Sequence, residues 1–103
     1  MYKVSFFVPV DYCEPVKDAM FSAGAGKIGN YDSCSFQTLG EGSFRPLEGS
    51  DAFIGSVGHM EKVQEYKVEM VCDQKYIHAA IQALIEEHPY ETPAYDVLKL
   101  ESF

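Results

Sequence analysis

Alternating apolar and polar side chains predict four β-strands in the chain. They are expected at residues 2–10, about 32–39, about 61–72 and about 94–101. In the first strand every second residue shares one apolar face: Tyr2, Val4, Phe6, Val8 and Val10. In the third strand the same face is formed by Tyr66, Val68, Met70 and Cys72, while the opposite face is mostly polar.

A period close to 3.6 residues predicts two helices between these strands. The first is expected at about 12–23, where one side collects Val16, Ala19, Met20 and Ala23. The second carries the clearest stripe in the chain: Ile77, Ala80, Ile81, Leu84, Ile85 and His88. Pro89 should end this helix, because proline lacks an amide proton and clashes with the preceding turn.

The resulting order, β-α-β-β-α-β, is typical of the ferredoxin-like α+β fold. It predicts a single domain over residues 1–103, with a four-stranded antiparallel sheet and two helices on one face, since crossover connections are right-handed. The other face would carry four apolar side chains: Phe7, Val71, Leu98 and Leu100. An apolar face of this kind favours cover by another copy of the chain.

The composition narrows the classes of partner. The chain has 16 acidic and 8 basic side chains and a formal net charge of −8, which repels nucleic acid and anionic membrane surfaces. The apolar run at residues 1–10 contains Pro9 and fits neither a signal peptide nor a spanning helix. Three cysteines, Cys13, Cys34 and Cys72, cannot all pair with one another, which predicts free thiols in the reducing cytoplasm.

Residues 24–31, here called the glycine turn, spell G-x-G-x-x-G. In dinucleotide-binding proteins this string follows a strand and opens a helix, but here a helix precedes it and a strand follows. We therefore expect it to end the first helix, with Gly24 or Gly26 in the left-handed conformation. Its amides, with Lys27, Asn30 and Arg45, could also bind a small anion. The alternative is that these side chains are solvated or pair with acidic neighbours.

The least regular segment is residues 40–58, which contains five glycines and one proline. Such a composition excludes a continuous helix. It nevertheless holds apolar side chains that a solvated linker would lack: Phe44, Leu47, Phe53 and Ile54. Long loops in small domains commonly serve function, so this segment is expected to bind a ligand or contact another subunit.

A second dense motif, His88-Pro89-Tyr90-Glu91, follows the second helix. One interpretation is a structural corner, in which His88 bonds locally and Tyr90 anchors the turn. The other gives His88 and Glu91 a metal-binding or proton-transfer role. His59 could join His88 and Cys34 in a metal site, although no pair among them has the spacing typical of metal ligands.

The thiols give little indication of catalysis. Cys34 and Cys72 fit inward-facing strand positions as small hydrophobic residues. A nucleophilic cysteine needs a nearby base, and the sequence indicates none. A small enzyme with a thiol or histidine site stays as a third alternative, testable at Cys34.

Four motifs in this order resemble the inserted middle domain of the YqfO proteins, members of the Nif-three-like family. They are the glycine turn with Cys34 and Phe36, the run from Gly40 to Pro46, the run from Glu65 to Glu69, and the segment from His88 to Tyr95. The resemblance covers nearly the whole chain. It implies a fold similar to CutA and to the PII signalling proteins, with trimeric assembly and a regulatory loop at residues 40–58.

Full-length members of that family bind two metal ions through domains that flank the insert, and those residues are absent here. The resemblance therefore implies no hydrolase activity for this chain. It favours a homo-oligomeric binding or regulatory module, a trimer or a multiple of it, and not an enzyme. The expected ligand is a small anion or a protein partner, and no cofactor is assigned.

The candidate ligand site combines the glycine turn, the irregular loop and the corner after the second helix. Its residues are Gly26, Lys27, Gly29, Asn30, Tyr31, Arg45, His88, Tyr90 and Glu91. The alternative function is a divalent-metal-binding protein that uses His59 and His88, with Cys34 or Glu91 as further ligands.

Overall fold

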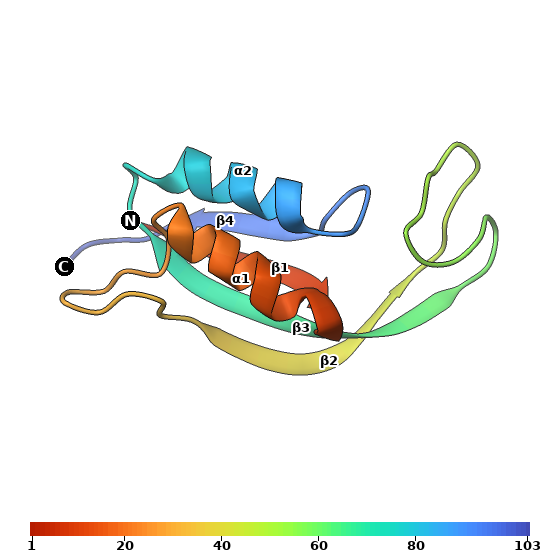
Figure 1. Cartoon of the computed structure of the whole chain (residues 1–103), viewed down its shortest axis with the longest axis horizontal. Coiled ribbons are helices and arrows are strands. Elements are labelled where there is room, and N and C mark those ends of the chain that lie inside the picture. Colours follow the sequence, from red (N-terminus) through yellow and green to blue (C-terminus); the bar gives the residue numbers. More distant parts are fainter.

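The computed structural model describes all residues from 1 to 103 and confirms the ferredoxin-like order. The elements are β1 (Tyr2–Pro9), a 3-10 helix η1 (Val10–Tyr12), α1 (Cys13–Ser22), β2 (Phe36–Phe44), β3 (Glu61–Cys72), α2 (Ile77–Glu87) and β4 (Tyr95–Lys99). Figure 1 shows both helices on one face of a single sheet. Neither helix is long and apolar enough to cross a membrane.

The four strands are arranged in the order β2-β3-β1-β4, and all neighbours are antiparallel. Val4 in the central strand β1 lies opposite Met70 of β3 and Val97 of β4. Because side chains alternate between faces, this register turns these apolar residues toward the helices. The expected alternation in β1 and β3 is therefore realised in the sheet.

The core lies between the sheet and the two helices. Its fully buried side chains include Phe6, Val68, Met20 and Leu84, one from each of the four packed elements. The stripe predicted for α2 is buried at Ile77, Ala80 and Leu84, but Ile85 remains exposed. The face through which α2 packs on the sheet is therefore narrower than its predicted apolar stripe.

Three strands have bounds that differ from the sequence expectation. β4 spans residues 95–99, where about 94–101 was expected. β1 ends at Pro9, so Val10 lies in η1 and is exposed. β2 begins at residue 36 and continues to residue 44, whereas the apolar pattern placed it at about 32–39. Gly40 and Gly42 lie in this strand and pair with β3. Glycines usually weaken strands, but they are tolerated where another group approaches closely.

The face of the sheet opposite the helices is uncovered. Phe36 and Leu98 are 61% and 58% exposed on it, and its centre holds an ionic cluster. Lys3 and Lys67 approach the Glu69 carboxylate at 3.1 and 3.8 Å. The uncovered face is therefore polar at its centre and apolar toward the outer strands.

The β2–β3 hairpin extends beyond the end of β1. Pro9, the last residue of β1, pairs with Glu65, so residues 61–64 of β3 pair only with β2. Residues 45–60, here called the β2–β3 loop, close this hairpin at one end of the molecule (Figure 1). The hairpin thus carries the loop past the end of β1 and toward the segment that follows α2 (Figure 1).

Candidate functional site

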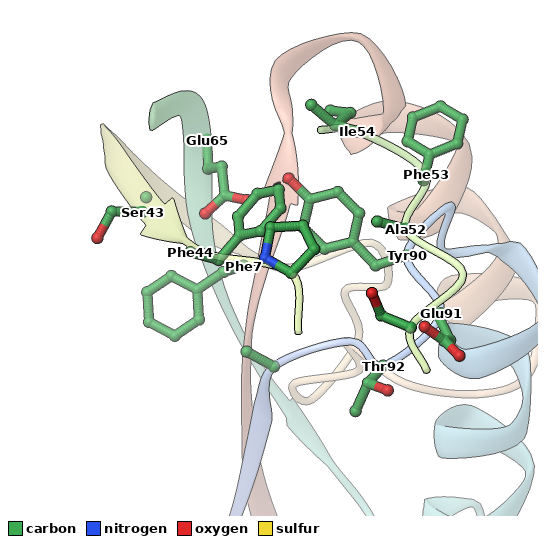
Figure 2. A pocket seen from close by; sticks show the side chains of 14 residues that line it. Phe7, Ser43, Phe44, Ala52, Phe53, Ile54, Glu65, Tyr90, Glu91 and Thr92 are labelled. Carbon is green, nitrogen blue, oxygen red and sulfur yellow. Dashed lines mark hydrogen bonds between the residues drawn. The ribbon is translucent and has the colours of Figure 1, made fainter. Parts of the chain in front are cut away.

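A cavity of about 410 Å³ lies where the β2–β3 loop meets residues 88–94, here called the α2–β4 corner. Figure 2 shows side chains from β1, β2, β3, the loop and the corner converging on it. The lining comprises Phe7, Gly42, Ser43, Phe44, Pro46, Ser50, Ala52, Phe53, Ile54, Glu65, Tyr90, Glu91, Thr92 and Ala94. Its size is typical of small-molecule sites.

The cavity is organised by a hydrogen bond between two side chains. The Tyr90 hydroxyl donates to Glu65 Oε2 at 2.7 Å, and Glu65 is only 8% exposed. Burial, and then the hydrogen bond to the Glu65 carboxylate, raises the pKa of Tyr90 far above its ordinary value. Tyr90 therefore stays protonated and serves as a fixed donor to the carboxylate.

Gly42 makes room for this carboxylate. A Cβ at position 42 would overlap Glu65 Oε1, so any larger residue would displace the Glu65 side chain. The φ angle of Gly42 is not in the left-handed region. The glycine is therefore required by the space beside Glu65 and not by the backbone conformation.

His88 supports the corner from behind Tyr90. Its Nε2 lies 2.7 Å from the Phe7 carbonyl oxygen, and its Nδ1 accepts the Tyr90 backbone N–H at 3.1 Å. These two bonds select the neutral tautomer with the proton on Nε2. Burial lowers the pKa of His88, although the Phe7 carbonyl and the charge of Glu65 oppose that shift. The structure thus matches the interpretation of this motif as a structural corner.

Two contacts hold the β2–β3 loop against the rest of the domain. The Asp51 backbone N–H donates to Glu91 Oε1 at 2.9 Å. The Phe53 ring packs edge-on against Tyr12, with centroids 5.4 Å apart. Within the loop, the Gly58 N–H donates to the Pro46 carbonyl oxygen at 2.8 Å and closes its base. The loop is therefore folded over the cavity and anchored to both the corner and η1.

The structure divides the predicted site residues between two ends of the molecule. Tyr90 and Glu91 line the cavity, His88 contacts Tyr90 from outside it, and Arg45 is an exposed residue between two lining residues. The glycine turn lies elsewhere: the Gly26 N–H donates to the Val71 carbonyl oxygen at the far end of β3. Figure 1 shows these two regions at opposite ends of the sheet.

The glycine turn has a structural role that its contacts explain. Gly24 and Gly26 have φ angles of 112° and 79°, as expected at the end of a helix. Side chains at these positions would collide with the rings of Tyr76 and Phe21. Lys27 lies over the Tyr76 ring, with Nζ 5.1 Å from the centroid. The remaining predicted residues of this turn, Gly29, Asn30 and Tyr31, are exposed.

The metal hypothesis is based on His59 and His88, with Cys34 or Glu91 as further ligands. No three His, Cys, Asp or Glu side chains lie together in an arrangement that could hold a metal ion. Both ring nitrogens of His88 are engaged, and His59 is exposed near the end of the β2–β3 loop.

The thiols lie outside the cavity. Cys13 and Cys72 are buried in the core, whereas Cys34 precedes β2 and is half-buried, so its expected inward strand position was wrong. Burial raises the pKa of Cys13 to about 11, which disfavours the nucleophilic thiolate.

Sequence reasoning missed the most buried charged residue of the site. Glu65 falls on the polar face of the alternating third strand, and nothing in that alternation separates it from its solvated neighbours Lys67 and Glu69. The resemblance included the run from Glu65 to Glu69 but gave Glu65 no role in a site. A further signal was the pair of glycines in β2, Gly40 and Gly42, which lie opposite Glu65 and Val63 of β3. Glycines inside a strand indicate close approach of another group.

Comparison with known proteins gives two kinds of relative. Proteins named GTP cyclohydrolase 1 type 2 homolog match at 43% identity over 100 residues in Halalkalibacterium halodurans and at 46% over 99 residues in Bacillus subtilis. These matches cover 97% and 96% of this chain. A solved Bacillus cereus protein related to NIF3 matches 98% of the chain with a TM-score of 0.83 and 40% identity. The chain is therefore related to the NIF3/YqfO family.

This relationship concerns one segment of the NIF3/YqfO proteins. The chain spans 27% and 26% of the two named relatives and 26% of the Bacillus cereus protein. CutA from Xylella fastidiosa matches 99% of the chain and 85% of its own length, with a TM-score of 0.71 and 18% identity, which concerns the fold alone. No family model matches the chain. The resemblance to the NIF3/YqfO family and the CutA-like fold are both confirmed.

Proposed function

We propose that this chain is a binding or regulatory module that assembles as a homo-oligomer and is not an enzyme. The observation that carries the proposal is the cavity beneath the β2–β3 loop, which combines aromatic walls with a buried carboxylate. Concave apolar sites with a few fixed polar groups are typical of small-molecule binding. The ligand is expected to contact the loop, the corner and the sheet together.

The chemistry of the lining favours binding over catalysis. It contains no cysteine, histidine or lysine that could act as a nucleophile or base at neutral pH. Its two carboxylates each hold a structural hydrogen bond, Glu65 to Tyr90 and Glu91 to the Asp51 amide. These acids therefore position the walls of the cavity.

The β2–β3 loop is the proposed regulatory element. It reaches the corner through the single hydrogen bond of Asp51 to Glu91 and through the packing of Phe53. A ligand that contacts both the loop and the corner stabilises the closed arrangement, because it binds that arrangement better than an open one. A partner that binds the surface of the closed loop would then bind better when the ligand is present.

Homo-oligomerisation is supported by the uncovered face of the sheet. The exposed side chains of Phe36 and Leu98 lie on the two opposite edge strands of this face and would be stabilised by burial. A head-to-tail contact between copies can bury them and close into a ring. We propose a trimer or a multiple of it, as the resemblance to PII and CutA proteins implies. The three free cysteines support a cytoplasmic location.

No cyclohydrolase activity is proposed for this chain. The name GTP cyclohydrolase 1 type 2 homolog belongs to proteins of which this chain covers 27% or less. The cavity is built entirely from residues of this chain, so it can be tested on this chain alone.

Two measurements test the proposal. Native mass spectrometry of the untagged chain should show a trimer or a multiple, and Leu98→Lys should dissociate it while Ile85→Lys, on the helical layer, should not. A fragment screen by protein-observed NMR should give hits that shift the amides of the β2–β3 loop and the α2–β4 corner. A monomer contradicts the assembly, and hits confined to other surfaces contradict the site.

A further inference from the structure

We propose that the cavity takes a small organic cation, an ammonium or guanidinium group carried on an apolar or aromatic stem. This rests on the proposed function, because it names the ligand class of the same site. The inference starts from the charge of the lining. Two residues of the lining are acidic, Glu65 and Glu91, and none is basic.

Glu65 is a buried carboxylate without a cationic partner in the chain. No lysine, arginine or histidine nitrogen lies within 4.0 Å of it. His88 is close enough to sense its charge, but both ring nitrogens already bond to backbone groups in the neutral tautomer. A buried charge is unfavourable unless it is paired, so a cation entering the cavity supplies the missing interaction.

The second oxygen of this carboxylate has no hydrogen-bond partner in the chain. Glu65 Oε2 accepts the Tyr90 hydroxyl, while Oε1 accepts no hydrogen bond. No fully enclosed side-chain oxygen lacks a partner, so the unbonded Oε1 keeps some accessible surface. Glu65 and Gly42 both line the cavity. Gly42 keeps the space beside Oε1 free of a side chain. A charged N–H donor is the group that best matches this oxygen.

Aromatic side chains line the same space. Phe44 and Phe53 lie against Tyr90 in tilted arrangements, with centroids 5.7 and 6.5 Å away, and all three residues belong to the lining (Figure 2). Cations bind favourably over the faces of aromatic rings, and the rings also accept an apolar stem. Glu91 provides a second carboxylate in the lining, and one of its oxygens accepts a hydrogen bond from the Asp51 backbone N–H.

The cations that could have favoured an anion lie outside the cavity. Lys27 packs on Tyr76 at the far end of the sheet, and the side chain of Arg45 is exposed. The net charge of −8 also attracts cations at long range and repels anions. The charge of the site and the charge of the whole chain therefore favour the same class of ligand.

The test compares three probes of the same shape and different charge. Phenethylamine is a cation, 2-phenylethanol is its neutral analogue, and phenylacetate is an anion. In protein-observed NMR titrations of the wild-type chain, phenethylamine should shift the amides of residues 42–54 and 90–94 and bind at least about tenfold tighter than the alcohol. Phenylacetate should leave these amides unshifted.

A matched pair of variants locates the charge. Glu65→Gln keeps an oxygen that accepts the Tyr90 hydroxyl, but it removes the negative charge and replaces the other acceptor oxygen with an NH2 donor, so it should weaken the binding of phenethylamine about tenfold or more. Glu87→Gln removes the same charge from the exposed surface of α2 and should leave the affinity unchanged.

The outcomes separate this inference from the proposed function. Equal binding of the amine and the alcohol at these amides, or equal affinities in the two variants, overturns the cation inference and keeps the site. If no probe of any charge shifts these amides, both proposals are overturned. The wild-type comparison decides the question even if Glu65→Gln does not fold.

Discussion

The Tyr90 hydroxyl lies 2.7 Å from Glu65 Oε2, although one residue follows α2 and the other lies in β3, 25 residues earlier. This bond fixes the α2–β4 corner against the projecting hairpin and orients the carboxylate of the cavity. It is also the only hydrogen bond that the chain offers this carboxylate. The stability of the domain should therefore respond to small changes at either residue.

Tyr90→Phe removes the hydroxyl and keeps the ring. The Glu65 carboxylate is then left without its donor, so we expect a loss of about 1–3 kcal/mol in the free energy of unfolding, measured by urea denaturation. Tyr31→Phe is the matched control, because Tyr31 is 75% exposed and its hydroxyl bonds to nothing in the chain. Equal stabilities of the two variants would show that the bond contributes nothing.

Gly42→Ala and Gly40→Ala form a second matched pair in β2. A Cβ at 42 overlaps Glu65 Oε1, whereas a Cβ at 40 meets nothing within 4 Å, and neither glycine has a positive φ. Gly42→Ala should be less stable than Gly40→Ala by about 1–3 kcal/mol, because Glu65 must leave Tyr90. In a Glu65→Ala background this difference should vanish, and its persistence would assign the effect to the backbone.

Because His88 is buried, the free energy of unfolding should fall on acidification. Burial lowers its pKa in the folded chain below the ordinary value of 6.5, so the unfolded chain binds the proton first. The contribution of His88 is complete above about pH 6.5 and is lost as the pH falls toward the folded pKa, by at most about 1.4 kcal/mol per pH unit.

Urea denaturation between pH 8 and 5 measures this slope. His88→Gln should flatten it in that range, whereas His78→Gln, which alters an exposed histidine in α2, should leave it unchanged. An unchanged slope in His88→Gln would assign the pH dependence to other groups.

The thiols should differ in reactivity by position. Cys13 and Cys72 are buried, and burial raises the pKa of both, to about 11 for Cys13. Iodoacetamide at pH 8 should therefore label Cys34 first in the folded chain and all three thiols in urea, as counted by mass spectrometry. Cys34→Ser should abolish the rapid native labelling, and labelling of Cys13 at a similar rate would contradict its placement in the core.

Much of the fold could be predicted because its main elements depend on local periodicity. The stripe from Ile77 to Leu84 and the alternation from Tyr66 to Cys72 each bury one face, so the residue pattern and the packing coincide. β2 was placed too early for the opposite reason. Its buried partner is the side chain of Glu65, for which Gly42 makes room, and no apolar pattern in the sequence indicates such a contact.

The candidate site was predictable only in part. The dense motif after α2 indicated Tyr90 and Glu91, both of which line the cavity. The sequence did not assign Phe7 and Glu65 to the site. Both residues line the cavity because the β2–β3 hairpin extends beyond the end of β1, which the sequence pattern does not show. The glycine turn attracted attention by composition, but its contacts with Tyr76 and Phe21 account for the glycines by packing.

The dispersed origin of the lining, from Phe7 to Ala94, links ligand binding to the folding of the whole domain. No fragment of the chain can form this cavity alone, so a ligand binds the folded state and not the unfolded one. At a free concentration one hundred times its dissociation constant, such a ligand raises the free energy of unfolding by about 2.7 kcal/mol. Thermal melting can thus serve as a detector for the natural ligand before its identity is known.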